Sequence, residues 1–122
     1  MGTESWLICI IGDYTKNKKE IDFLDNLFKN SSTSNDHIIK IPIYEYRKEE
    51  ENDFKIGMDY YIYERGCIYQ SDYIILICNN RSDKSFIFNF GLIFGTKKEF
   101  KVLTPNTIKE FSIKKFNNEI KK

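Results

Sequence analysis

Three polar loops hold the side chains of this sequence that are best placed to bind a small molecule. They span residues 12–16, 44–53 and 79–85, and each lies at the end of an apolar run that predicts a strand. Asp13 and Asp83 put carboxylates into two of these loops, and a carboxylate can accept hydrogen bonds from a ligand. In parallel sheets, ligands bind outside the carboxyl ends of the strands. We therefore expect a ligand site where the three loops meet.

The first of these loops lacks the glycines of a phosphate-binding loop. Gly12 is its one glycine, whereas dinucleotide-binding and P-loop motifs need GxGxxG or GxxxxGK[ST]. Gly12 and Asp13 are equally well explained as an ordinary turn. Three widely spaced cysteines and a single histidine, His37, match neither a zinc site nor a disulfide framework. The sequence therefore predicts no metal and no cofactor.

The elements that position the loops alternate between strands and helices. Strands are predicted at residues 6–11, 37–46, 72–78 and 100–103, and helices at residues 17–29, 56–71, 86–95 and 105–120, with an exposed loop at residues 47–55. Pro42 cannot donate to a sheet, so the second strand should end, bend or lie at an edge there. Asp72 starts a buried strand, where we expect its carboxylate to anchor a turn or a backbone amide.

This alternation predicts one α/β domain over residues 1–122, with a parallel sheet of four or five strands and helices on both faces. The helix at residues 86–95 is apolar on nearly every side, which is typical of a buried central helix. Ser82 or Asp83 would cap its start.

Charge and hydropathy exclude several kinds of partner. The chain has 122 residues, with 19 Lys and Arg against 18 Asp and Glu, and a net charge of +1. Such a protein has no overall field to attract nucleic acid or anionic lipid. No apolar run approaches the roughly 20 residues that span a bilayer, and residues 1–4 do not resemble a secretory start. With its unpaired cysteine pattern, the chain is expected to be cytoplasmic.

The segment at residues 83–95 resembles the signature helix of nucleoside 2-deoxyribosyltransferases. Asp83 falls at the family's Asp, Phe88 at its aromatic residue, Asn89 at its Glu and Gly91 at its Gly. The same segment is similar to a helix of TIR-like nucleotide-binding domains. This resemblance implies a flavodoxin-like three-layer domain with a nucleoside-sized or nucleotide-sized pocket.

Further upstream, Glu64 falls where the transferases carry an Asp that contacts the departing base. The likeness covers most of residues 6–104 and implies a homo-oligomer in which a neighbouring subunit completes the site. It also implies that Gly12, Asp13 and Tyr14 of the first loop face the ligand.

Asn89 departs from the family at its most important position. In the transferases the Glu attacks the sugar C1′, expels the base and forms a covalent glycosyl-enzyme. An amide is a far weaker nucleophile, so this chemistry should be lost or severely reduced, whereas Asn89 can still hydrogen-bond sugar hydroxyls. Ser85 and Phe86 replace the family's small-residue turn with one that carries a bulky ring. Another carboxylate could stand in for the missing Glu, and the candidates are Glu45, Glu49, Glu50 and Glu51.

The sequence therefore predicts a transferase-like protein that binds a nucleoside, nucleotide or NAD-like molecule and is impaired in catalysis. The expected catalytic positions are Asn89 and Asp83, and the expected substrate-binding residues are Gly12, Asp13, Tyr14, Glu64, Ser85, Phe88 and Gly91. Two alternatives remain. One is a non-enzymatic module that captures a nucleotide or signalling dinucleotide. The other is a TIR-like domain that binds NAD or self-associates through a partly exposed, Phe-rich helix.

Overall fold

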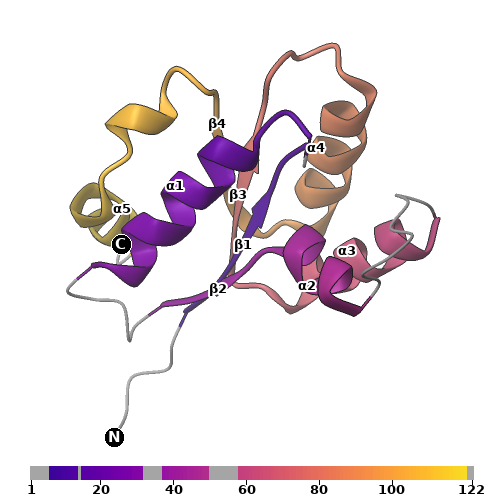
Figure 1. The fold of residues 1–122 in the computed structure, drawn as a ribbon, viewed down its shortest axis with the longest axis horizontal. Coiled ribbons are helices and arrows are strands. Elements are labelled where there is room, and N and C mark those ends of the chain that lie inside the picture. Colours follow the sequence, from indigo (N-terminus) through magenta and orange to yellow (C-terminus); the bar gives the residue numbers. More distant parts are fainter. Residues whose placement is uncertain (1–5, 14, 32–36, 50–57, 121–122) are drawn as a thin grey trace, which may run out of the picture.

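A computed structural model describes residues 6–13, 15–31, 37–49 and 58–120. Strands and helices alternate along most of this part of the chain (Figure 1). The elements are β1 (Trp6–Ile11), α1 (Lys18–Lys29), β2 (His37–Lys40), α2 (Pro42–Glu49), α3 (Met58–Gln70), β3 (Tyr73–Ile77), α4 (Lys84–Thr96), β4 (Glu99–Leu103), a 3-10 turn (Ile108–Glu110) and α5 (Ile113–Ile120).

The four strands form one parallel sheet in the order β2-β1-β3-β4, which confirms the predicted flavodoxin-like α/β class. All five residues of β3 are buried, as expected for an unbroken Ile- and Leu-rich run covered on both faces. Asp72 precedes this strand, and its Oδ2 accepts a hydrogen bond of 2.9 Å from the Leu7 backbone N–H. The predicted anchoring role of Asp72 is therefore confirmed.

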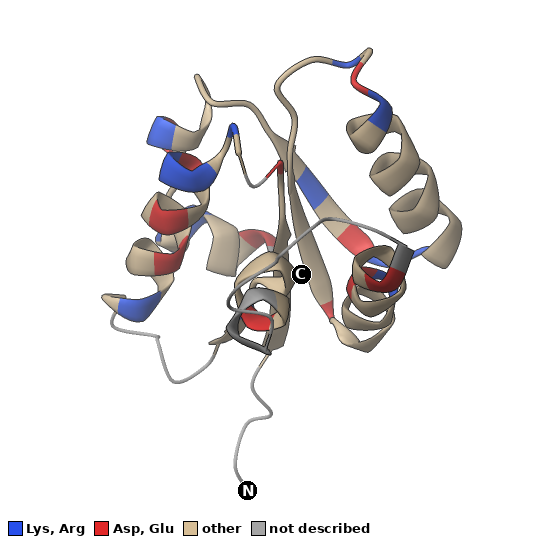
Figure 2. Ribbon diagram, turned by 45° about the vertical axis from the view of Figure 1, so that its right-hand side comes forward, with Lys and Arg blue, Asp and Glu red and all other residues tan. Residues whose placement is uncertain are grey.

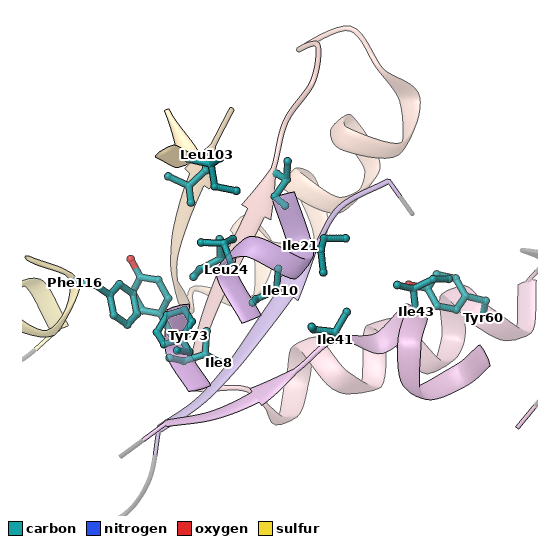
Figure 3. Close-up of a cluster of buried hydrophobic side chains, with 14 residues drawn as sticks. Ile8, Ile10, Ile21, Leu24, Ile41, Ile43, Tyr60, Tyr73, Leu103 and Phe116 are labelled. Atoms are coloured by element: carbon teal, nitrogen blue, oxygen red, sulfur yellow. The ribbon is translucent and has the colours of Figure 1, made fainter. Parts of the chain in front are cut away.

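Helices cover both faces of the sheet, and each face has its own apolar core. On one face, side chains of α1 and α5 pack against Ile8, Ile10 and Ile75, in the cluster drawn in Figure 3. On the other face, side chains of α3 and α4 pack against Cys9, Ile74 and Leu76. Alternate residues of each central strand therefore serve opposite cores, as the period of a strand requires.

The predicted strand at residues 37–46 is wrong beyond Lys40, because Pro42 begins α2. Proline suits the first position of a helix, where its missing N–H would have had no partner. The Ile41 carbonyl accepts from the Tyr44 and Glu45 N–H groups and so starts the helix. The predicted loop is likewise wrong at residues 47–49, and its remainder lies outside the described residues.

The last predicted helix is wrong in its first half. Instead of one helix from Pro105, the chain forms the 3-10 turn at Ile108–Glu110 and begins α5 at Ile113. The Thr104 N–H donates to Thr107 Oγ1 at 2.8 Å, and the Thr107 N–H donates to Thr104 Oγ1 at 3.2 Å. Threonine hydroxyls that bond to nearby backbone in this way compete with helix formation.

The predicted helix at residues 86–95 is confirmed as α4, but its expected burial is wrong. Asn89 and Ile93 are its two buried residues, whereas Ile87, Phe88 and Phe94 are each more than half exposed. From Ser85 to Thr96 the helix carries no charged residue (Figure 2). One side of α4 therefore packs on the sheet, and an uncharged apolar side is left open.

Candidate functional site

A cavity of about 160 Å³ lies at the carboxyl ends of β1 and β3. Its walls come from the loops after these two strands and from helices α2, α3 and α4. We call it the inner cavity, and its lining residues are Gly12, Asp13, Thr15, Ile43, Tyr60, Tyr61, Glu64, Leu76, Ile77, Asn79, Asp83, Ser85, Phe86 and Asn89. It occupies the edge of the sheet at which parallel α/β proteins bind ligands.

Asn89 lines the inner cavity from the sheet-facing side of α4. Its side chain is 7% exposed, and its Oδ1 is the one fully buried side-chain N or O atom among the described residues that has no hydrogen-bond partner. A buried polar atom left unsatisfied costs about 1–3 kcal/mol. A ligand that donates a hydrogen bond to Asn89 Oδ1 would remove that cost.

Glu64 is a buried carboxyl group in the same cavity. It is 4% exposed, and the Tyr60 hydroxyl donates to its Oε2 at 2.7 Å. Burial raises the pKa of Glu64 above its ordinary value, and the hydrogen bond from Tyr60 opposes the rise only in part. Glu64 is therefore biased toward its neutral form, which can donate a hydrogen bond as well as accept one.

Asp13, in contrast to Glu64, is stabilised in its ionised form. Partial burial disfavours its charged form, but hydrogen bonds from Thr15 and Lys16 outweigh this effect and lower its pKa. Its Oδ1 accepts from the Thr15 hydroxyl at 2.7 Å, from the Thr15 N–H at 2.9 Å and from the Lys16 N–H at 3.1 Å. The inner cavity thus contains one carboxyl group biased toward neutrality and one held ionised.

Two asparagines join the loops that carry the site. Asn17 is fully buried, and its Nδ2 donates to Asn79 Oδ1 at 2.7 Å, while Asn79 Nδ2 donates to Asn17 Oδ1 at 2.9 Å. Asn17 Oδ1 also accepts from the Asp13 N–H at 3.1 Å. Gly12 lets the loop after β1 pack closely against Ile77 and Asn17. A Cβ at this position would lie 3.3 Å from Ile77 Cβ and 3.4 Å from Asn17 Cβ.

Six of the nine predicted site residues line the inner cavity, namely Gly12, Asp13, Glu64, Asp83, Ser85 and Asn89. Phe88 lies outside it, in a neighbouring groove. Gly91 lines neither space and lies on the exposed side of α4. Tyr14 lies outside the described residues.

Sequence reasoning missed Asn17, Asn79 and Tyr60. Asn79 follows directly on a predicted strand within a nominated loop, which was a usable signal. Asn17 gave none, because its partner Asn79 is brought near by the fold. Tyr60 lies four residues before Glu64 in a predicted helix, and this spacing was also a usable signal.

Of the candidate replacement carboxylates, Glu45 has a described side chain, and it does not line the inner cavity. Glu45 points elsewhere: its Oε2 accepts from the Tyr63 hydroxyl at 2.7 Å and lies 3.6 Å from Lys40 Nζ. Glu50 and Glu51 fall outside the described residues, as does the side chain of Glu49.

Within residues 6–13, 15–31, 37–49 and 58–120, no three His, Cys, Asp or Glu side chains gather as a metal-binding group. In that same part of the chain, no helix has the length and apolar character to cross a bilayer.

Comparison with known proteins gives a match in fold. No protein-family model and no curated protein matches the sequence. Among solved structures, a 2-desoxiribosyltransferase from Leishmania mexicana matches with a TM-score of 0.56 at 15% identity. The match covers 81% of this chain and 64% of that one, so this chain spans less than two-thirds of its length. The expected resemblance to the deoxyribosyltransferases is thereby confirmed at the level of the fold.

Proposed function

We propose that this protein binds a nucleoside or nucleotide in the inner cavity and is a deoxyribosyltransferase-like protein with impaired catalysis. One observation carries the proposal. Asn89, which the sequence resemblance places at the position of the family's nucleophilic Glu, is buried against the cavity with an unpaired Oδ1. A side chain kept for packing alone would be apolar or fully hydrogen-bonded.

The polar groups of the cavity suit a nucleoside. The Asn89 amide accepts from one sugar hydroxyl and donates to another acceptor, and the ionised Asp13 accepts from a further hydroxyl. Glu64, whose pKa is raised by burial, presents a carboxyl group that can pair with the edge of a base. Ile77 and Phe86 supply apolar wall between these polar contacts.

Impaired catalysis follows from the available nucleophiles. Displacement of a base needs an electron pair that attacks C1′ and forms a C–O bond as the C–N bond breaks. The lone pair of an amide is delocalised, so Asn89 does not supply it. Glu64 is biased toward its neutral form, in which a carboxyl group is a poor nucleophile.

Base exchange tests the catalytic part of the proposal. The wild-type protein and Asn89→Glu are each incubated with the four deoxynucleosides and a different free base, and separately with NAD. We expect no exchange and no nicotinamide release above background from the wild type. Exchange or release by the wild type at a rate comparable to that of Asn89→Glu would refute the loss of activity.

Ligand-dependent melting tests the binding part. A ligand that binds only the folded state raises Tm progressively as its concentration increases. We expect such a rise with at least one nucleoside or nucleotide, and a weaker rise for Asn89→Leu. Unchanged melting across the whole panel would contradict the proposal.

We also propose that copies of the chain associate through the open side of α4. The exposed apolar side chains of α3 and α4 are Tyr61, Ile62, Tyr69, Ile87, Phe88 and Phe94. Tyr61 and Phe88 join the two helices, with ring centroids 5.9 Å apart.

This surface also favours the self-associating TIR-like alternative, which differs in needing no ligand. Assembly without any melting response to nucleosides, nucleotides or NAD would favour that alternative over the transferase-like protein.

A further inference from the structure

Acidic groups line the inner cavity without basic partners. Asp13, Glu64 and Asp83 are lining residues, whereas no Lys or Arg of the described part of the chain is one. Lys16 contacts Asp13 through its backbone N–H, and Lys84 lines the neighbouring groove. None of the ion pairs found among the described residues involves any of the three carboxyl groups. The cavity therefore attracts a cation and repels an anion.

Glu64 is the most deeply buried of the three carboxyl groups. It is 4% exposed, whereas Asp13 and Asp83 are partly exposed. Burial raises the pKa of Glu64, and the hydrogen bond from the Tyr60 hydroxyl offsets this rise only in part. A positive charge nearby would favour the ionised form of Glu64. A cationic ligand would supply the charge that the described side chains do not.

A carboxyl group at this buried position calls for an explanation, because an amide would serve its other contacts. A glutamine in place of Glu64 would still accept from the Tyr60 hydroxyl. It would also donate to and accept from the edge of a neutral base, without the cost of burying an ionisable group. What glutamate adds is the capacity to carry a negative charge. That capacity favours a positively charged ligand over a neutral one.

The carboxyl groups are not arranged to hold a metal ion. Over residues 6–13, 15–31, 37–49 and 58–120, no three His, Cys, Asp or Glu side chains come together as a metal-binding group. Hard cations need several oxygen ligands that converge within about 2.6 Å of one point. An organic cation suits carboxyl groups that are spread around a cavity.

Aromatic rings line the cavity beside Glu64. They belong to Tyr60, Tyr61 and Phe86. The Tyr60 hydroxyl bonds to Glu64 at 2.7 Å, and the ring centroids of Tyr60 and Tyr61 are 5.7 Å apart. The face of an aromatic ring attracts a cation that lies within about 6 Å of its centre. A flat cationic group can therefore contact a carboxylate and an aromatic ring in the same cavity.

The unpaired Asn89 Oδ1 marks this cavity as a ligand site independently of its charge. The hydroxyls of Tyr60 and Thr15 already donate to Glu64 and Asp13. A ligand in the cavity therefore has to bring hydrogen-bond donors of its own, and a cation with N–H groups brings both the donors and the charge.

We propose that the ligand is a nucleoside whose base carries a positive charge, as in an N-alkylated purine or pyrimidine nucleoside. The charged base lies against Glu64 and the rings of Tyr60 and Tyr61, and the sugar hydroxyls face Asp13 and Asn89. Glu64 then lies beside the base and not beside the sugar C1′, so its ionised form does not replace the missing nucleophile. This inference rests on the proposed function, because it assumes a nucleoside in the inner cavity.

Calorimetry with isomeric ligands tests the inference. 1-Methyladenosine and 3-methylcytidine are cations at neutral pH, whereas their isomers N6-methyladenosine and N4-methylcytidine are neutral. Each is titrated into the wild-type protein, Glu64→Gln and Glu110→Gln. Glu110 is exposed on the 3-10 turn, so its variant loses a carboxylate away from the site. We expect at least one cation to bind the wild type about tenfold or more tightly than its neutral isomer.

In Glu64→Gln this ratio of affinities should fall toward one, whereas in Glu110→Gln it should stay as in the wild type. Neutral isomers that bind the wild type as tightly as the cations would overturn the inference of a charged base and leave the proposed function standing. A ratio that survives Glu64→Gln would overturn the pairing of the base with Glu64. Absence of binding by every nucleoside and nucleotide, charged or neutral, would overturn the proposed function and this inference together.

Discussion

Asn17 and Asn79 lie 62 positions apart in the sequence and exchange two side-chain hydrogen bonds, of 2.7 and 2.9 Å. The pair joins the start of α1 to the loop after β3. Through the Asp13 N–H it also fixes the loop after β1. Hydrogen bonds between the buried Asn17 amide and the Asn79 amide therefore hold together the two loops that line the inner cavity.

Replacing Asn17 should destabilise the protein. Asn17→Ala removes both bonds of the amide pair and leaves Asn79 and the Asp13 N–H without these partners. We expect the free energy of unfolding to fall by about 2–3 kcal/mol, measured by urea denaturation. Asn118→Ala, at an exposed position on α5, is the control and should change it by less than about 0.5 kcal/mol. Equal effects of the two variants would contradict the structural role of the pair.

Two glycines should respond in opposite directions to the same substitution. Gly12→Ala brings a Cβ to 3.3 Å from Ile77 Cβ, which is tighter than ordinary contact, and should cost about 1 kcal/mol or more. Gly66 lies within α3, and a Cβ there meets no atom within 4 Å. Gly66→Ala should therefore stabilise the helix by about 0.5–1 kcal/mol. Thermal unfolding of the two variants measures both effects, and a stabilising Gly12→Ala would refute the close packing of the first loop.

The pH dependence of stability should reveal the buried Glu64. Because its folded-state pKa is raised above the ordinary value of 4.5, the folded protein holds this proton more tightly than the unfolded chain does. The contribution of Glu64 to stability should therefore decline as the pH rises above about 4.5 and through the raised pKa.

Glu64→Gln keeps an acceptor for the Tyr60 hydroxyl but cannot titrate. Compared with this variant, the wild type should lose stability as the pH rises from about 4.5 through the raised pKa of Glu64, measured by urea denaturation at a series of pH values. Glu110→Gln, at an exposed carboxylate, is the matched control. If the free energies of unfolding of the wild type and Glu64→Gln differed by the same amount at every pH, the pKa of Glu64 would not be raised in the folded protein.

Self-association should depend on the open side of α4. Phe94 is 67% exposed, and Phe94→Glu places a charge on that side of the helix. We expect the wild type to gain mass with concentration in sedimentation or light-scattering measurements, and Phe94→Glu to remain a monomer. Phe23→Glu makes the same change on α1, on the other face of the sheet, and should assemble like the wild type. A wild type that stays monomeric at high concentration would contradict the proposed interface.

The sheet and the position of Asn89 were accessible from the sequence, because unbroken apolar runs separated by amphipathic segments constrain the topology strongly. The expectation that the second strand would end or lie at an edge near Pro42 is confirmed, since β2 ends at Lys40 and is an edge strand. The helix that Pro42 begins was not predicted, because a proline after a short strand does not reveal whether a loop or a helix follows. The burial of α4 was also misjudged. An apolar helix does not reveal which side meets the sheet, and Ile87 and Phe94 prove to lie on the other side.

The site was predictable where it depends on local sequence and not where it depends on distant partners. Asp83, Ser85 and Asn89 reach the cavity together because they share the first turns of one helix. The hydrogen bond between Tyr60 and Glu64 also joins neighbours on one helix, but its burial is set by packing against other elements. The amide pair of Asn17 and Asn79 depends on the whole sheet being assembled first.

A crystal structure of the protein soaked with deoxynucleosides and their 5′-monophosphates tests the central claim most directly. The account predicts a ligand in the inner cavity, with a donor group about 2.7–3.2 Å from Asn89 Oδ1 and an uncleaved bond between sugar and base. A ligand bound elsewhere, or one cleaved in the crystal, would contradict it.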